Sequence, residues 1–431
     1  MKQGCILSPK IFSLVMSELS FRLLECGAGY QLDDNSVLPG LLVADDVFLI
    51  SESPTDLQKL LDVAYSVGVD LGLKFSSDKT RVMKLNDATV RNWALGPLDV
   101  LECQEYVYLG VTLESNKTIF KKHKDLTIAK ANKLCGWVKH IAYRSHNKYL
   151  IGRTLWKSVA VPAITYGNEL ILGNVGYFSN LNTIQNRLGR FLLGGNKLSP
   201  LIACHGDMGW SNFEDRDASS KLKYLGRLVF MSDERIAKSL YKLNYGSPLA
   251  LTWEDQAEYY DSEITVHINN KVAWDKLISA SVKMVSANLF HEVVETFTTL
   301  CVYSCKTQPK VENLYDNTKG SALLFQARSG SLPLNSRTHH WNGFGKACRV
   351  CTSGIEESLQ HFFFECPLYS TEREELLKVL HNHNKIGPIT YLDAIRSLLG
   401  FFKPSDMLIS STKFFLASSW KKRQDSLPAI D

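Results

Sequence analysis

Apolar positions near the amino end of the chain follow helical spacing in two segments. From Ser8-Pro9 they recur every three or four residues as far as Leu23, and glycines follow directly. A second such segment starts at Ser53-Pro54, where serine suits the cap of a helix and proline suits its first turn. Its apolar stripe ends near Gly68. Two amphipathic helices are therefore predicted in this part of the chain.

Short apolar runs between and after these helices predict β-strands. Leu41 to Val43 and Val47 to Ile50 flank Asp45-Asp46, a pattern that predicts a hairpin with an acidic centre. Tyr106 to Leu113 is a further β-rich run, interrupted by Gly110. Helix and hairpin alternate without a repeated βαβ pattern, so the fold class predicted for the front of the chain is α+β.

After residue 115 the periodicity becomes helical. The first of these helices carries lysines and is predicted to bury one face: Leu134, Trp137, Val138, Ile141 and Ala142. Further helices are predicted around residues 147–160, 180–193, 215–245, 254–300 and 370–382. The polar stretch from Thr307 to Lys319 has no periodicity and is interpreted as a linker.

Length and composition are those of a globular protein with room for two or three domains. The 431 residues are 45% hydrophobic and 22% charged. No apolar run reaches the ~18–20 residues that a membrane-spanning helix needs, and the start of the chain has no signal-peptide pattern. We therefore expect an intracellular protein, in the nucleus or the cytoplasm, with no membrane partner. Its ten cysteines are interpreted as thiols or metal ligands and not as a disulfide framework.

The net charge of +5 conceals a concentrated basic block. Residues 117–157 contain eleven lysines and arginines and one acidic residue, Asp125, so this segment alone carries +10. Four aromatic residues are interleaved with it: Trp137, Tyr143, Tyr149 and Trp156. This composition suits a polyanion such as nucleic acid. A solvated lysine-rich helix face explains the charge equally well, so both interpretations stay open on composition alone.

Asp45 and Asp46, between two apolar arms, form the sharpest local motif. Adjacent carboxylates that are buried or half-buried are costly unless a cation compensates them. A tight turn between hydrophobic strands would hold them rigidly, and phosphoryl transfer at a two-metal site needs such oxygen ligands. An ordinary surface hairpin with aspartate in its turn produces the same short pattern. For the isolated motif, that simpler interpretation is favoured.

Four separate blocks change this balance. They occur in the following order: Gln3-Gly4 through Pro9, the Asp45-Asp46 hairpin, Gly72 to Phe75 with Lys79-Thr80, and Tyr108-Leu109-Gly110. In this order and spacing they resemble the later conserved blocks of reverse transcriptases from non-LTR retrotransposons. The resemblance implies a partial polymerase palm and nucleotidyl transfer that uses magnesium (Mg²⁺). It also implies an RNA template and a DNA primer as partners.

Individual residues inherit roles from this resemblance. As catalytic residues, Asp45 takes the primary metal-binding role, Asp46 supports it, and Lys79 closes over the nucleotide triphosphate. The residues predicted to bind the template, the incoming nucleotide or the primer end are Gln3, Gly4, Tyr108, Leu109 and Gly110.

The start of the chain departs from the family in a serious way. The family carries a further metal-binding aspartate on a strand ahead of the Gln-Gly block, and this chain starts at that block. Met1 stands where the family often has an internal apolar residue, as an N-terminally truncated copy would show. Without this metal-binding aspartate, we expect the chain alone to be inactive as a polymerase. The missing N-terminal part of the same polyprotein is then a predicted partner.

Later stretches extend the resemblance. The basic block fits the thumb of the family, the helical domain that tracks the template–primer backbone, which favours the nucleic-acid interpretation of residues 117–157. Trp156 to Pro162 and Gly206 to Trp210 resemble the post-polymerase region of arthropod elements. No chemical role follows for these two stretches, and packing explains them.

The second strong motif consists of Cys348, Cys351, His361 and Cys366. Thiolates and imidazole at such spacing close a tetrahedral site that suits zinc (Zn²⁺) better than calcium or magnesium. Chance clustering is the alternative, but three of the ten cysteines fall within nineteen residues. Non-LTR retrotransposon proteins end in a similar CCHC zinc knuckle, often after a stretch like Leu332 to Arg337.

Neighbouring polar residues are not expected to be ligands. His339 and His340 lie outside the compact spacing and are interpreted as surface or core residues. Glu356 and Glu357, between the two halves of the knuckle, are interpreted as part of a solvated loop.

The predicted organisation has five segments: a partial palm (1–115), a basic helical thumb (116–200), a helical C-terminal region (201–345), the CCHC knuckle (346–370) and C-terminal helices (371–431). The first hypothesis is an RNA-directed DNA polymerase of the nucleotidyltransferase type, represented by a fragment of a transposable element. The alternative is a non-catalytic, zinc-dependent nucleic-acid-binding remnant. A relic without function is the third, because an open reading frame is compatible with all three.

Overall fold

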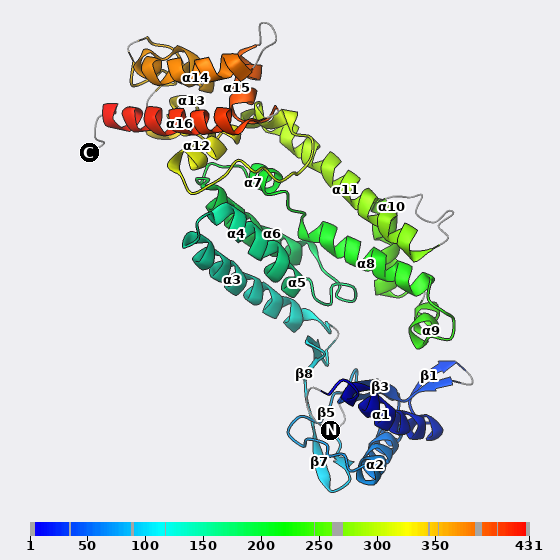
Figure 1. Cartoon of the computed structure of the whole chain (residues 1–431). Helices are drawn as coiled ribbons and strands as arrows, with labels where there is room; N and C mark the ends of the chain where they lie inside the picture. Colours follow the sequence, from blue (N-terminus) through cyan, green and yellow to red (C-terminus); the bar gives the residue numbers. More distant parts are fainter. Residues whose placement is uncertain are drawn as a thin grey trace. The chain divides into compact units, whose positions relative to one another are not determined.

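The computed structural model describes residues 5–33, 36–87, 90–116, 118–244, 246–260, 270–343, 345–351, 353–383, 390–402 and 404–427. The chain divides into two compact units, which are described separately (Figure 1). Unit 1 comprises residues 1–125 and 227–252, and unit 2 comprises residues 126–226 and 253–431. The five predicted segments are not tested by this division and stay a prediction.

Unit 1 is built around two packed helices, α1 (Ser8–Glu25) and α2 (Pro54–Asp70). Ser53 caps α2, because its side chain accepts a hydrogen bond from the amide of Asp56 at 3.1 Å. Leu19 of α1 and Leu60 of α2 are completely buried in the shared core. Both helices predicted for this part of the chain are therefore confirmed.

Small sheets surround these helices in the described part of unit 1. Three antiparallel hairpins are present: β1 (Tyr30–Asp33) with β2 (Ser36–Leu38), β3 (Gly40–Val43) with β4 (Asp46–Leu49), and β8 (Glu105–Tyr108) with β9 (Val111–Glu114). In a further sheet β7 (Leu98–Glu102) lies between β5 (Arg81–Val82) and β6 (Trp93–Leu95). A two-stranded hairpin alone is marginally stable in water. The β3–β4 hairpin gains support from Leu42, Val47 and Leu49, which pack on the helical core.

Helix α3 (Lys121–Tyr143) buries a stripe of small side chains. That stripe consists of Ala131, Cys135, Val138 and Ala142. The predicted face was partly wrong, because Trp137 stays 43% exposed. Small residues allow the helix to approach its neighbours closely, which a buried tryptophan at that position would prevent.

Two aromatic residues of the basic block belong to the core of unit 2. The helix α4 (Lys148–Leu155) continues through a π-helical turn (Trp156–Ala160) into α5 (Val161–Ile164). Trp156 is completely buried and donates its indole N–H to Gln185 of α6 (Val175–Leu193) at 3.0 Å. Tyr149 is also buried. Of the four interleaved aromatic residues, only Trp137 and Tyr143 are exposed.

The remaining described helices fall into two groups. The first consists of α7 (Leu201–Met208), α8 (Phe213–Val229), α9 (Ile236–Leu243), α10 (Pro248–Tyr260) and α11 (Lys271–Thr296). The second consists of α12 (Lys319–Arg328), α13 (Asn335–Asn342), α14 (Ser370–His383), α15 (Tyr391–Leu398) and α16 (Asp406–Ser426). In the second group α12 and α14 both pack on α16 (Figure 1). Among the described residues, no helix is both long and apolar enough to cross a bilayer.

The structure refines one prediction from periodicity and corrects another. The helical stretch predicted around residues 215–245 consists of two helices, α8 and α9, with a turn between them in which Ser232 and Asp233 lie, as such residues favour. The stretch from Thr307 to Lys319 is irregular, as predicted, but it is not a solvated linker. Leu314 and Tyr315 within it are buried in the core of unit 2.

A completely buried carboxylate, that of Asp207, holds this irregular stretch in place. Arg328 contacts it with two nitrogens, Nε at 3.0 Å and Nη2 at 3.1 Å, and the Lys306 ammonium lies 2.8 Å from Oδ1. Tyr303 and Tyr315 donate their hydroxyls to the same carboxylate. We refer to these five residues as the Asp207 cluster.

The Asp207 cluster connects elements that are distant in sequence. Asp207 belongs to α7 and Arg328 to α12, and Arg328 also donates to the carbonyl oxygen of Leu399 at the end of α15. Burial alone would raise the pKa of Asp207, but Arg328 and Lys306 hold it well below its usual range. The stretch from Gly206 to Trp210, which had no role from the sequence, therefore supplies the anion at the centre of unit 2.

Asp207→Asn is expected to destabilise unit 2 by about 3–5 kcal/mol, because two buried cations lose their main counter-charge. Urea denaturation of the full chain, followed by tryptophan fluorescence, measures this difference. The folded pKa is depressed, so the carboxylate's contribution is complete above the unfolded pKa of about 4 and is lost as the pH falls further. The difference from wild type should thus be constant from neutral pH down to about pH 4 and shrink below it.

Asp233→Asn is the matched control, because Asp233 forms an exposed ion pair with Lys242. It should leave the free energy of unfolding unchanged. Equal stability of Asp207→Asn and wild type at neutral pH would contradict the structural role of the Asp207 cluster.

Candidate functional sites

The Asp45-Asp46 pair lies at the tip of a tight hairpin. Val43 of β3 pairs with Asp46 of β4, so Ala44 and Asp45 form a two-residue turn. Ala44 has a φ of 53°, a region that L-residues rarely adopt and that short hairpin turns use. Both carboxylates are exposed. The desolvation argument for a compensating cation therefore does not apply to this hairpin.

The donor chemistry of the pair nevertheless suits a hard divalent cation. Mg²⁺ takes oxygen ligands and is usually held by one or two carboxylates together with substrate phosphates and water. Within the described ranges, no third His, Cys, Asp or Glu joins Asp45 and Asp46 to form a group of three. The pair thus fits one side of a magnesium site whose other ligands come from elsewhere.

Strand β8 places Tyr108 beside this pair. The Tyr108 ring packs on Phe48, with ring centroids 4.9 Å apart. Phe48 and Asp46 are two residues apart on β4, so their side chains leave the strand on the same face. Burial raises the pKa of Tyr108, and the negative charge of Asp46 raises it further. The Tyr108 hydroxyl is buried and has no hydrogen-bond partner in the described part of the chain.

Strand β8 also contacts the loop that carries Lys79. The Tyr106 hydroxyl donates to the carbonyl oxygen of Lys79 at 3.1 Å, and the Lys79 side chain is exposed. Tyr106 was missed as a site residue, although its spacing from Tyr108 is that of two side chains on one strand face.

The other residues predicted to bind substrate are Leu109, Gly110, Gln3 and Gly4. Leu109 and Gly110 form the turn between β8 and β9, with φ values of 47° and 80°. Gln3 and Gly4 lie outside the described residues.

The four predicted zinc ligands come together in unit 2. The ligand atoms of Cys348, Cys351, His361 and Cys366 all lie within 4.8 Å of one another. Tetrahedral zinc with metal–sulfur distances of ~2.3 Å separates its sulfur ligands by roughly 3.8 Å, so donor set and spacing fit a zinc ion. His361 opens a π-helical turn (His361–Glu365), and Cys366 follows directly. We refer to the four residues as the CCHC cluster.

The thiols of the CCHC cluster differ in acidity. Burial raises the pKa of Cys366 to about 12 and also raises that of Cys348. Burial opposes ionisation of Cys351 too, but hydrogen bonds from Ser353 and from its neighbours in the cluster lower its pKa to about 7. Glu365 Oε2 lies 3.4 Å from His361 Nδ1, on the side of the ring away from Cys351. A carboxylate hydrogen-bonded to this nitrogen would orient a metal-binding imidazole, but among the described residues Nδ1 has no hydrogen-bond partner.

A buried ion pair stabilises the segment that carries the CCHC cluster. Glu357 is 1% exposed, and its carboxylate oxygens lie 2.7 and 2.8 Å from two nitrogens of Arg423. The same carboxylate accepts the amide of Asn335 at 2.7 Å, and the Asn335 side chain donates to the carbonyl oxygen of Ala347. The interpretation of Glu357 as part of a solvated loop was therefore wrong. Asn335, from the stretch Leu332 to Arg337, fixes the start of the cluster.

The lysines of α3 lie on its solvent side. Lys121, Lys122, Lys130 and Lys133 are exposed, whereas the apolar stripe faces the core. Lys130 donates to the carbonyl oxygen of Ala163 at 2.9 Å. The exposure is compatible with both interpretations of the basic block, a solvated face and a surface for nucleic acid.

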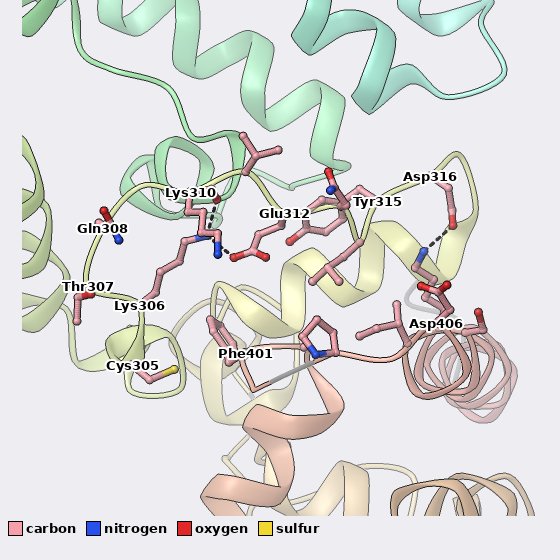
Figure 2. Close-up of a pocket in the computed structure, with 18 residues that line it drawn as sticks. Cys305, Lys306, Thr307, Gln308, Lys310, Glu312, Tyr315, Asp316, Phe401 and Asp406 are labelled. Atoms are coloured by element: carbon pink, nitrogen blue, oxygen red, sulfur yellow. Dashed lines mark hydrogen bonds and ion pairs between the residues drawn. The ribbon is translucent and has the colours of Figure 1, made fainter. Parts of the chain in front are cut away.

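A groove of about 840 Å³ opens beside the Asp207 cluster (Figure 2). It is lined by residues from the ranges 305–316 and 400–413. Two of its lysines are engaged in ion pairs, Lys306 with Glu312 and Lys413 with Asp316. These pairs neutralise the charge of both lysines.

The elements that carry the candidate polymerase residues all lie within the first 114 residues, from α1 to β9. Residues 1–113 match the reverse transcriptase (RNA-dependent DNA polymerase) family model. The resemblance to reverse transcriptases that the four sequence blocks predicted is therefore confirmed for the family in general. No curated protein matches the chain. The match covers 113 of the 431 residues and does not include α3 or the CCHC cluster.

Glu357→Gln is expected to lower the free energy of unfolding of unit 2 by about 3–5 kcal/mol, because Arg423 would stay buried without a counter-charge. Chemical denaturation monitored by tryptophan fluorescence reports the change, and Trp420, which packs against Arg423, contributes to that signal. Glu356→Gln is the neighbouring control at an exposed position and should have no effect. The same small effect for both variants would show that the ion pair does not support the CCHC cluster.

Proposed function

We propose that the chain is part of an RNA-directed DNA polymerase of a non-LTR retrotransposon, of the type found in arthropods. The observation that carries the proposal is the match of residues 1–113 to the reverse transcriptase family, on a fold that presents Asp45 and Asp46 at an exposed hairpin tip. The substrates would be an RNA template, a DNA primer and nucleoside triphosphates, inside the cell in the nucleus or the cytoplasm.

The residues of unit 1 would act by holding and orienting substrates. Asp45 and Asp46 would hold Mg²⁺, which when bound activates the primer hydroxyl and neutralises the charge that develops on the phosphates. The exposed Lys79 would contact the triphosphate, since an ammonium group attracts phosphate oxygens. Tyr108, Leu109 and Gly110 would contact the primer end next to this site.

We further propose that the chain by itself does not synthesise DNA. The described residues place two carboxylates at the hairpin and no third ligand with them. Two-metal transfer needs ligands on both sides of the cation pair, so a further carboxylate from another polypeptide segment would complete the site.

Primer extension on an RNA template with Mg²⁺ or Mn²⁺ tests this prediction. The chain should give no processive synthesis, and Asp45→Asn should be indistinguishable from wild type. Extension by the wild-type chain that disappears in Asp45→Asn would contradict the predicted inactivity.

Nucleotide binding tests the polymerase assignment itself. Binding of a fluorescent nucleoside triphosphate in the presence of Mn²⁺ should weaken about tenfold in Asp45→Asn and in Lys79→Ala, because each loses a charged contact to the metal–triphosphate complex. Lys59→Ala, at an exposed lysine of α2, is the control and should bind as wild type does. Equal binding by all four proteins would contradict the polymerase assignment.

A second candidate function rests on α3 and the CCHC cluster, which lie outside the family match. Exposed lysines along α3 and a donor set that fits zinc suit a non-catalytic, zinc-dependent nucleic-acid-binding protein. Zinc would fix the segment 348–366 on the core of unit 2. In this case binding would be independent of Asp45.

Salt-dependent binding of single-stranded RNA separates the two candidates. If four lysines of α3 each neutralise a phosphate, affinity for single-stranded RNA should fall about 50-fold between about 50 and 200 mM salt. Zinc removal with a chelator, or Cys351→Ser, should abolish binding, and Asp45→Ala should not change it. Lys130→Glu with Lys133→Glu should weaken binding, whereas Lys283→Glu at an exposed position of α11 should not. No binding at low salt would exclude this candidate.

A further inference from the structure

Strand β8 touches both parts of the candidate polymerase site with one face. Its burial alternates along the strand: Glu105 and Val107 are exposed, and Tyr106 and Tyr108 are partly buried. Side chains two residues apart leave a strand on the same side, so the two tyrosines form one inward face. This face meets two segments that carry predicted catalytic residues.

The first contact fixes the loop of Lys79. The Tyr106 hydroxyl donates to the Lys79 carbonyl oxygen at 3.1 Å. The loop itself is a short turn in which the amides of Lys79 and Thr80 both bond the carbonyl oxygen of Ser76. The tyrosine therefore holds the backbone of Lys79 and leaves its ammonium group free to point to solvent.

The second contact reaches the acidic hairpin. Tyr108 packs on Phe48, on the face of β4 from which the Asp46 carboxylate also projects. Its hydroxyl is buried without a hydrogen-bond partner among the described residues. A buried hydroxyl without a partner costs about 1–3 kcal/mol, so the formation of a hydrogen bond to a nearby acceptor is strongly favoured. The acidic residue on that face of β4 is Asp46.

We propose that β8 positions the candidate polymerase site. The Tyr108 hydroxyl donates a hydrogen bond to the Asp46 carboxylate when that carboxylate holds a cation, and Tyr106 holds the loop of Lys79 in place. The inference rests on the proposed metal-binding role of Asp46. The carboxylate would hold the cation, and the hydroxyl would orient the carboxylate, as groups hydrogen-bonded to metal ligands commonly do. Tyr106 is thus a positioning residue, and Tyr108 combines a positioning role with its proposed contact to the primer end.

Terbium luminescence tests the placement of Tyr108 in the full chain. Tb³⁺ takes oxygen ligands as Ca²⁺ does, and excited tyrosine sensitises its emission only at short range. The emission that disappears in Asp46→Asn is the part that comes from the ion held by the hairpin, and the remaining emission comes from other bound ions. Tyr108→Phe should lose most of this Asp46-dependent emission, and its Mn²⁺ affinity, measured by water-proton relaxation, should fall about tenfold. Tyr143→Phe, at a 75% exposed tyrosine, is the matched control and should behave as wild type.

Tyr106→Phe provides an independent check. It should retain the Asp46-dependent emission and increase amide hydrogen exchange in residues 76–81, because the anchor of the Lys79 loop is lost. Normal emission and Mn²⁺ affinity in Tyr108→Phe, with a clear effect of Asp46→Asn, would overturn this inference and leave the metal-binding role intact. If Asp46→Asn changes neither emission nor affinity, both the metal-binding role and the inference are overturned.

Discussion

The burial of one carboxylate dictates the course of much of unit 2. An ionised group in the interior is tolerated only with counter-charges and hydrogen bonds at the same place. For Asp207 these come from Lys306 and Arg328, 99 and 121 residues further along the chain. The irregular stretch before α12 follows its path because Lys306 and Tyr315 must reach this carboxylate, and not because of any secondary-structure preference of its own.

The two candidate sites are held together by different physics. The CCHC cluster is fixed by buried polar contacts, chiefly Glu357 with Arg423 of α16 and Asn335 of α13, so its ligands belong to the core of unit 2. The Asp45-Asp46 hairpin has no such buried charges. Its shape comes from the backbone turn with positive φ at Ala44 and from the contact of Phe48 with Tyr108 of β8. A defect in a buried pair would thus disturb the first site, and a backbone change would disturb the second.

The sequence was informative wherever the decisive interactions are local. The cap at Ser53, the apolar arms around Asp45-Asp46 and the close spacing of the four zinc-type ligands all act within a few residues, and the structure contains each of them. Predictions failed where the partner is remote. Periodicity alone could not show that Trp156 bonds Gln185 or that Glu357 pairs with Arg423, because both contacts depend on how helices pack. Tyr106 was missed for the same reason, since its partner lies 27 residues away.

The exposure of Asp45 and Asp46 has a consequence for how copies of such a gene would change over time. Neither side chain is buried, so folding places little demand on either of them. Asp207, in contrast, is required by the core. In a lineage of copies that had lost their activity but still encoded a folded protein, substitutions would accumulate at the hairpin tip while Asp207 stayed unchanged. The persistence of the Asp-Asp pair across related copies would therefore record selection on chemistry, separately from selection on folding.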